Sequence, residues 1–344
     1  MKMSRRSRRE WRIILWVLMA SAAISAWFGI KVGPENDPML RSAIHGIVTS
    51  LVIATPIVIV QLKADSWAPL RRLRRLPLAV YFALKTLFYA AMIIGGLIVA
   101  RIILGDDVRL DQTFRQAIVF SIAMAVVGNL FFEFGGLLGL GTLRNLLTGR
   151  YVQPRTEQRT FLLIDMKDST GLAERLGPVL FHELLNDFFR DVSDAALECN
   201  AEIHKYVGDE AILTWLGTAG LGDGTALSCS FLARDVIASH RARYVDRFGA
   251  VPDYRAALHC GAVVAGEIGD VRREIAFVGD TLNVAARLLD ASKAIGRDIL
   301  VSVELLGRSK LPDGVRAEAL PTLAVRGRVE PLAIAALDRI SAAP

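Results

Sequence analysis

The sequence is poor in cysteine, with three in 344 residues, Cys199, Cys229 and Cys260. Their number is odd and none stands in a CxxC pair, so neither a disulfide framework nor a zinc site is indicated. We expect three buried free thiols. The sequence also contains no internal repeat and no low-complexity tract, so a repeat architecture is not indicated.

Charge is almost absent from four long stretches, residues 11–30, 42–62, 78–104 and 114–140. Each is long enough for a helix to cross a bilayer core of roughly 30 Å. Because three further stretches follow the first, the first is not interpreted as a cleaved signal peptide. The hydrophobic fraction of 53% is too high for a purely soluble protein, so we predict four membrane spans in a lipid bilayer.

The formal charge of +6 is carried largely by short Lys and Arg runs beside these spans, so no nucleic-acid partner is expected. Basic residues gather in the N-terminal tail, in the loop after the second span and after the fourth span, whereas the other two loops are balanced or acidic. Positive loops stay on the cytoplasmic side. This predicts a multi-pass inner-membrane protein with its N-terminus and everything after residue 141 in the cytoplasm.

Four polar side chains lie in or near the spans, namely His45, Lys85, Asn129 and Glu133. Ionisable groups in a membrane are costly unless they face protein or water. We expect contacts between helices, and a sensing or cofactor role stays open. Because His45 is the one histidine in the predicted membrane spans, bis-histidine haem ligation there within one chain is excluded.

The sequence predicts three regions: a four-helix transmembrane domain at 1–140, a polar linker at 141–158, and a second domain at 159–344. In the second domain strands are expected at 161–166, 201–207, 211–216, 254–259 and 275–278. Helices are expected at 178–198, from the glycine-rich stretch 220–224 to about 248, and from 280. The order βαββαβ is typical of a ferredoxin-like α+β fold.

Asp165 ends the first of these strands, and Asp209 lies at the tip of the following hairpin. An antiparallel sheet can bring them together, where two carboxylates repel unless a cation such as magnesium lies between them. Aspartates at strand ends more often cap or solvate a turn, so the pair alone is weak evidence.

Further along, Asp280 is expected to cap a helix that carries Asn283 and Arg287 one turn apart on one face. That face suits a polyphosphate, although a capping Asn and a surface Arg are equally compatible with the spacing. Lys205 stands roughly 13 Å before Asp209 on an extended strand and is therefore either an edge lysine or a base-reading donor.

Five segments resemble, in order, the signatures of class III nucleotide cyclases: FLLIDMKDST (161–170), KYVGDE (205–210), HCGAVVAGEIG (259–269), VGDTLNVAARL (278–288) and VRGRVEPL (325–332). The resemblance covers about residues 159–340. It implies that Asp165 and Asp209, helped by the backbone carbonyl of Met166, bind two Mg²⁺ ions per site, with Mn²⁺ as a substitute.

The resemblance also implies roles in substrate binding and catalysis. Lys205 would contact adenine, Asn283 would position the ribose, Arg287 would stabilise charge on the reacting phosphate, and Arg328 would touch the terminal phosphates. Ala276 stands where relatives usually have an Asp or Thr that reads the purine. Two other departures are Asp168, where a glycine is common, and Ala262, where some relatives have an Arg.

A membrane-anchored adenylate cyclase is thus expected, which converts ATP to 3′,5′-cyclic AMP and pyrophosphate as a homodimer through its catalytic and membrane domains. In such enzymes each site takes the metal aspartates from one subunit and the Lys, Asn and Arg from the other. A guanylate or mixed-purine cyclase, or a non-enzymatic membrane receptor with a nucleotide-binding cyclase-like domain, stays open. A diguanylate cyclase is disfavoured because the hairpin reads VGDE rather than GGDEF.

Overall fold

The computed structural model describes residues 5–32, 38–63, 76–105, 107, 109, 111–271, 273–324 and 330–340. The chain divides into two compact units, Met1–Leu143 and Arg144–Pro344, and each is described by itself. The stretch 141–158, expected as a linker, contains most of helix α6 (Leu140–Leu147) and the first residues of strand β1.

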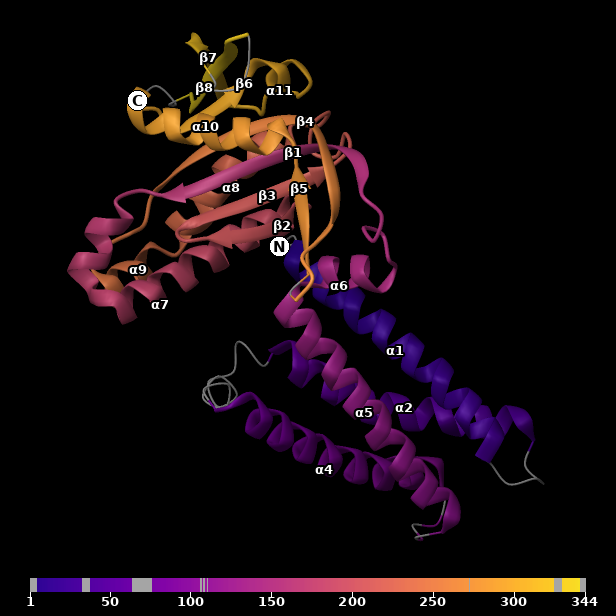
Figure 1. The fold of residues 1–344 in the computed structure, drawn as a ribbon. Coiled ribbons are helices and arrows are strands. Elements are labelled where there is room, and N and C mark those ends of the chain that lie inside the picture. Colours follow the sequence, from indigo (N-terminus) through magenta and orange to yellow (C-terminus); the bar gives the residue numbers. More distant parts are fainter. Residues whose placement is uncertain are drawn as a thin grey trace. The chain divides into compact units, whose positions relative to one another are not determined.

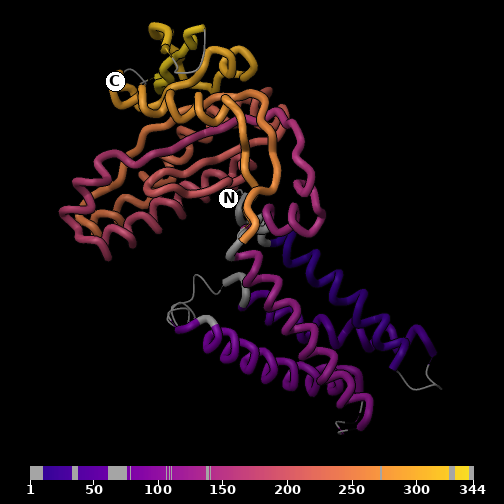
Figure 2. The backbone as a smooth tube through the Cα atoms, in the orientation of Figure 1, coloured from indigo at the N-terminus to yellow at the C-terminus, as the bar shows by residue number. Residues whose placement is uncertain are grey.

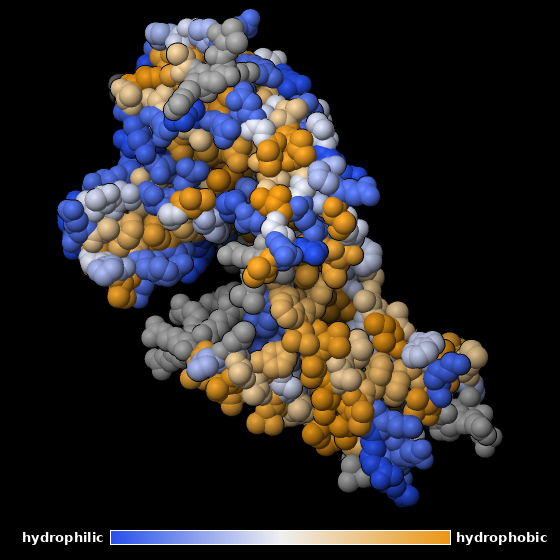
Figure 3. Space-filling view, in the orientation of Figure 1, coloured by the Kyte–Doolittle hydropathy of each residue, from blue (hydrophilic) through white to orange (hydrophobic). Residues whose placement is uncertain are grey.

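The first unit consists of long apolar helices: α1 (Arg5–Val32), α2 (Met39–Lys63), α4 (Leu78–Leu104) and α5 (Gln112–Leu138) (Figure 1). Each contains a segment of 22 to 26 residues that is long and apolar enough to cross a membrane. The four predicted spans are therefore confirmed as candidate membrane helices. Apolar side chains cover most of the visible face of this unit (Figure 3).

The polar groups of this unit behave in two ways. Lys85 on α4 pairs with Glu133 on α5 at 2.5 Å, so the predicted contact between helices is confirmed for these two residues. The prediction is wrong for Asn129, which is 3% exposed and whose two amide atoms have no hydrogen-bond partner in the described part of the chain.

The second unit is built on one eight-stranded sheet in the order β2-β3-β1-β4-β6-β8-β7, with β5 paired to β4. The strands are β1 (Arg155–Met166), β2 (Glu202–Val207), β3 (Glu210–Leu216), β4 (Tyr254–Ile268), β5 (Glu274–Val278), β6 (Ile299–Ser302), β7 (Val315–Leu323) and β8 (Leu332–Arg339). Neighbours among β2, β3, β1 and β4 are all antiparallel, which confirms the ferredoxin-like βαββαβ arrangement. Figure 2 follows β1 and β4 as adjacent tubes although they are far apart in sequence.

Helices α7 (Ser169–Glu198), α8 (Thr225–Ser239), α9 (Arg241–Phe248), α10 (Asp280–Ile295) and α11 (Val303–Gly307) complete this unit. The single helix expected up to 248 is wrong, because the chain bends at His240 and continues as α9. The bend lets the apolar side of α9 bury Tyr244 and Phe248. α7 breaks at Gly177, where φ is 73°, so the part from Pro178 to Glu198 agrees with the expected helix, and an additional helical segment from Ser169 precedes it.

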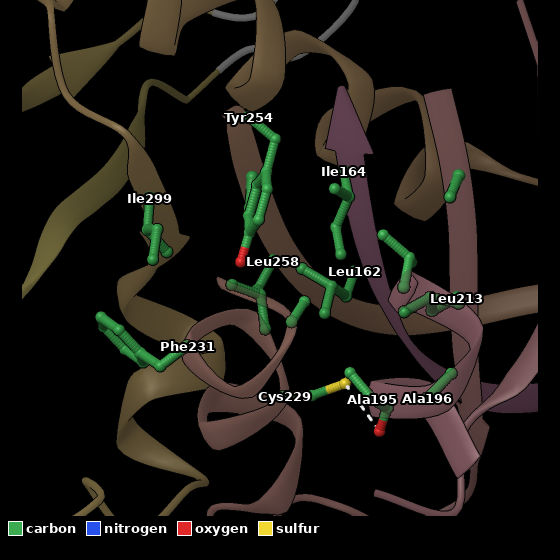
Figure 4. Packing of buried hydrophobic residues seen from close by; sticks show 14 of the residues in the cluster. Leu162, Ile164, Ala195, Ala196, Leu213, Cys229, Phe231, Tyr254, Leu258 and Ile299 are labelled. Atoms are coloured by element: carbon green, nitrogen blue, oxygen red, sulfur yellow. Dashed lines mark hydrogen bonds between the residues drawn. The ribbon is translucent and has the colours of Figure 1, made fainter. Parts of the chain in front are cut away.

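Alternation along β1 creates two cores. Leu162 and Ile164 point to the core formed with α7 and α8, where Cys229 packs against Ala195 (Figure 4). Phe161 and Leu163 belong to the opposite core, which includes Leu288 of α10. β1 is therefore buried on both faces, as its continuous apolar run predicts. All three cysteines are buried and free, as expected.

Candidate active site

Asp165 and Asp209 meet at one edge of the sheet. Asp165 stands next to last in β1 and lies opposite Glu210, the first residue of β3. The backbone N–H of Met166 donates to the carbonyl oxygen of Asp209 at 3.4 Å. The predicted convergence of the two aspartates is thus present in the fold, because β1 and the β2–β3 hairpin end together.

The charge at this edge is poorly balanced. Burial, and then the charge of Asp209, raises the pKa of Asp165 above its usual range. Burial, together with Asp165 and Asp209, raises the pKa of Glu210 to about 7. Lys293 Nζ on α10, 3.2 Å from Asp165 Oδ2, offsets part of this charge, and Arg255 acts on Asp165 more weakly. The group of carboxylates therefore suits an additional cation.

The oxygen donors at this edge suit an open magnesium site better than a metal site that is closed by protein ligands alone. Among the described residues no group of three or more His, Cys, Asp and Glu is arranged to hold a metal ion. Magnesium usually binds through one or two carboxylates and completes its octahedron with water and substrate phosphates. Two aspartates at one open edge are compatible with this kind of hard-oxygen site.

Asn283 and Arg287 lie one turn apart on the exposed side of α10, as predicted. Arg287 is 57% exposed, and its Nη1 lies 3.7 Å from Asp290 Oδ2. The helix start differs from the prediction. Gly279 is the N-cap at φ 148°, and Asp280 is the first helical residue rather than a side-chain cap.

Thr281 anchors this helix start instead. Its hydroxyl donates to the carbonyl oxygen of Ala262 at 2.7 Å. A Cβ atom added at Gly261 would lie 2.6 Å from the Thr281 hydroxyl, so this glycine permits the close approach of helix and strand. Ala262, one of the departures from the family pattern, thus helps to position α10 through its backbone carbonyl.

Lys205 and Ala276 lie on β2 and β5. Lys205 Nζ lies 3.6 Å from Glu274 Oε1 at the start of β5. Ala276 pairs with Gly266 of β4 and is 9% exposed. The ring of His204 lies 4.6 Å from that of Phe277, and burial lowers the pKa of His204 to about 4. Contacts between β2 and β5 therefore bring the two positions expected near the purine close together, and Ala276 itself is buried.

One chain does not bring all predicted site residues together. Lys293 contacts Asp165 from the C-terminal part of α10, and Asn283 lies ten residues earlier, about 15 Å along the helix axis. Asn283 is therefore remote from the aspartates of its own chain. Arg328 lies outside the described residues.

Two charged residues at the metal edge, Glu210 and Lys293, were missed by the sequence analysis. Glu210 follows Asp209 directly at the hairpin tip, and this adjacency was the available signal; its position opposite Asp165 depends on the β1–β3 register, which the hairpin does not set. Lys293 has no comparable signal, because its contact depends on how α10 packs across the sheet.

Asp168 departs from the glycine that is common in relatives, and the backbone explains the preference. Its φ is 53°, in the left-handed region that glycine adopts without steric cost. Its carboxylate accepts a hydrogen bond from Arg175 at 3.2 Å, outside the helix cap itself. The departure therefore changes a turn beside the site and leaves the two aspartates in position.

The fold and the two-carboxylate edge define a catalytic domain of the nucleotide cyclase type. Residues 151–333 match the family model described as "Adenylate and Guanylate cyclase catalytic domain", and the chain belongs to this family. It is 37% identical over 262 residues to Adenylate cyclase 2 of Rhizobium meliloti, covering 76% of this chain and 71% of that protein.

Two further proteins are similar to this chain. An adenylate cyclase of Anabaena cylindrica is 28% identical, over 52% of this chain and 36% of its own length. The fold is similar to that of a bacterial light-regulated adenylyl cyclase, with a TM-score of 0.54, 15% identity, and coverage of 67% of this chain and 66% of that chain. The second comparison supports the fold alone.

Proposed function

We propose that this protein is a membrane-anchored adenylate cyclase that converts ATP to 3′,5′-cyclic AMP and pyrophosphate at sites shared by two copies of the chain. The observation that carries the proposal is the separation of Asn283 from the aspartate edge of its own chain, about 15 Å along α10. A two-fold dimer supplies the missing half of each site from the partner copy.

Asp165, Asp209 and the carbonyl of Met166 would hold two Mg²⁺ ions, with Mn²⁺ as a substitute. The chemistry supplied by the bound ions is activation of the ribose 3′-hydroxyl and neutralisation of the leaving pyrophosphate. Asn283 orients the ribose so that the 3′-oxygen faces the α-phosphorus. Arg287, exposed and weakly paired, stabilises charge on that phosphate, and Arg328 contacts the terminal phosphates.

ATP is the proposed substrate because Lys205 offers a hydrogen-bond donor to the base and the relative with 37% identity is named an adenylate cyclase. Ala276 cannot hydrogen-bond a purine through its side chain, so base selection depends on Lys205. A guanylate or mixed-purine cyclase is the alternative. Product analysis with ATP and with GTP separates them, and equal turnover of both would overturn the preference for ATP.

For the membrane half, we propose that α1, α2, α4 and α5 anchor the dimer in the inner membrane. The catalytic domain would lie in the cytoplasm, where ATP is. The charge pattern of the loops supports this orientation. Protease access to the second unit in sealed inverted vesicles, but not in intact cells without their outer membrane, is the expected result.

Complementation tests the shared sites. Asp209→Ala and Asn283→Ala chains should each be inactive alone. Mixed in equal amounts, half of the dimers are mixed and one of their two sites is intact, so about one quarter of wild-type activity should return.

The matched control is Asp165→Ala mixed with Asp209→Ala. Both changes remove the same half of the site, so no activity should return. Recovery in this control, or none in the first mixture, would overturn the shared-site proposal. A wild-type protein that is folded, dimeric and able to bind ATP, but that shows no turnover, would favour the non-enzymatic receptor instead.

A further inference from the structure

A cavity of about 670 Å³ lies among α1, α2, α4 and α5 in the first unit. Its lining is mostly aliphatic and aromatic, with a small number of polar groups such as Ser42, His45 and Asn129. This volume and composition are typical of small-molecule sites, which combine apolar walls with a few polar groups that fix orientation. The stacked rings of Phe28 and Phe120, 4.0 Å apart, join α1 to α5 at this lining.

Asn129 is the side chain of this lining that packing leaves unsatisfied. It is 3% exposed, and neither its amide oxygen nor its amide nitrogen has a hydrogen-bond partner among the described residues. It stands seven residues before the end of the candidate span Gln112–Gly136, about 10 Å along the helix from that end. At that depth a lipid headgroup does not reach it, and an amide without a partner in apolar surroundings is costly.

Three other polar residues of the lining, Ser21, Ser50 and Arg101, have partners. The hydroxyls of Ser21 and Ser50 are 2.7 Å apart. Arg101 donates to both carboxylate oxygens of Asp111 at 2.9 and 3.0 Å and to the carbonyl of Arg109. None of the described lining residues is acidic, so nothing in the cavity calls for a cation, and the guanidinium of Arg101 is not available to an anion.

We infer that the cavity binds an uncharged lipophilic molecule whose carbonyl or hydroxyl group pairs with the amide of Asn129. An amide offers both a donor and an acceptor, so either polar group satisfies it. The apolar remainder of the ligand fills the space between the helices. This inference is independent of the nucleotide site, because every residue that carries it belongs to Met1–Leu143.

The test uses the full-length protein in nanodiscs of phosphatidylcholine and phosphatidylglycerol, with benzophenone as a photolabel. Labelled peptides are located by mass spectrometry. Two competitors of similar shape are added, diphenylmethanol, which has a hydroxyl, and diphenylmethane, which has none. With concentrations expressed as mole fractions in the bilayer, diphenylmethanol should compete about three- to tenfold better in the wild type, the effect of one hydrogen bond.

Three variants sharpen the result. In Asn129→Leu the two competitors should become equal, while an apolar label can still enter. Ala125→Phe fills the lining and should abolish labelling of the cavity peptides. Ala123→Phe makes the same change on the exposed side of α5, outside the lining, and should leave labelling unchanged.

Two outcomes would overturn the inference. Labelling that Ala125→Phe and Ala123→Phe affect alike would mean that the label reports bulk lipid and that acyl chains fill the space. Absence of cavity labelling, together with intermolecular disulfide formation by a cysteine introduced at Ala125, would mean that a helix of a second copy occupies it.

Discussion

Two pairs of aspartates in the second unit differ in how far neighbouring side chains compensate their negative charge. The carboxylates of Asp187 and Asp191 on α7 are paired with arginines and a tyrosine hydroxyl. Arg243 donates to both carboxylate oxygens of Asp191 at 2.9 and 2.8 Å, and the Tyr244 hydroxyl donates to it at 2.8 Å. Asp187 pairs with Arg190 at 3.1 Å and with Arg247.

Asp165 and Asp209 have no such compensation. Glu210 adds a third carboxyl group. Lys293, itself 52% exposed, pairs with Asp165, and the charge of Arg255 acts on Asp165 more weakly. Buried charges are ordinarily paired, so an excess of one sign marks a place where a ligand completes the balance. The first pair holds α9 against α7, whereas the second is suited to binding a metal ion.

The largest expected effect is on the uncompensated pair. Asp209→Ala should lower cyclase turnover at least about a thousandfold, because it removes a proposed ligand of the ions that would stabilise the transition state. The free energy of unfolding without metal should stay the same or rise, since a like charge is removed beside Asp165. Turnover and urea unfolding of the same preparation measure the two effects.

Asp313→Ala, in an exposed turn, is the control for that substitution and should change neither quantity. An Asp209→Ala variant that kept its turnover would contradict the two-metal assignment. One that unfolded would mean that Asp209 has the structural role assigned here to Asp191.

The compensated pair should respond in the opposite way. Asp191→Ala leaves the Arg243 guanidinium without its bidentate partner and should reduce the free energy of unfolding by about 3 to 5 kcal/mol. Turnover per folded molecule at low temperature should be unchanged. The double variant Asp191→Leu with Arg243→Met should recover part of the loss, because neither charge is then left unpaired.

The next prediction concerns His204, a largely buried side chain whose pKa is lowered by burial and by the nearby cations Lys205 and Arg159. Its folded-state pKa of about 4 lies below the usual 6.5, so the neutral ring is favoured in the fold. As pH falls below 6.5, the unfolded chain takes up a proton that the folded chain does not, and stability is lost until about pH 4. Between pH 7 and 5 the loss should be about 1 to 2 kcal/mol.

His204→Gln should remove most of that pH dependence. Amide hydrogen exchange in β2 and β3 of the full-length protein measures it, with His182→Gln on α7 as the control. An equally steep pH dependence in His204→Gln would assign the effect to other groups.

The sequence predicted the parts of this fold that depend on local patterns. Apolar runs identified the four candidate spans, and the strand ends identified Asp165 and Asp209 as neighbours. The strands β6, β7 and β8 were not predicted, because their pairing joins segments with no distinctive spacing. The N-cap at Gly279 was missed because it depends on backbone conformation rather than on a capping side chain.

Packing decides the rest of the site. Lys293 meets Asp165 because α10 packs over β4 and β1, and Asn129 lines a cavity among the helices where no described residue pairs with its amide. Neither relation follows from residue type or spacing. The family resemblance supplied the remaining roles, and for Asn283 and Arg287 those roles stay predictions.

The smallest expected effect concerns Lys293, the cation shared by the uncompensated carboxyl groups. Its ammonium would compete with the proposed metal ion for Asp165 Oδ2 and would repel the ion through its charge. Lys293→Met should therefore lower the magnesium concentration that gives half-maximal turnover by about threefold, a modest effect because the side chain is half exposed. Lys310→Met, an exposed lysine in the loop before β7, is the matched control and should leave the magnesium requirement unchanged. A higher magnesium requirement in Lys293→Met would mean instead that this lysine helps to hold the substrate phosphates, and the balance of charge at this edge would then have to be counted with the nucleotide bound.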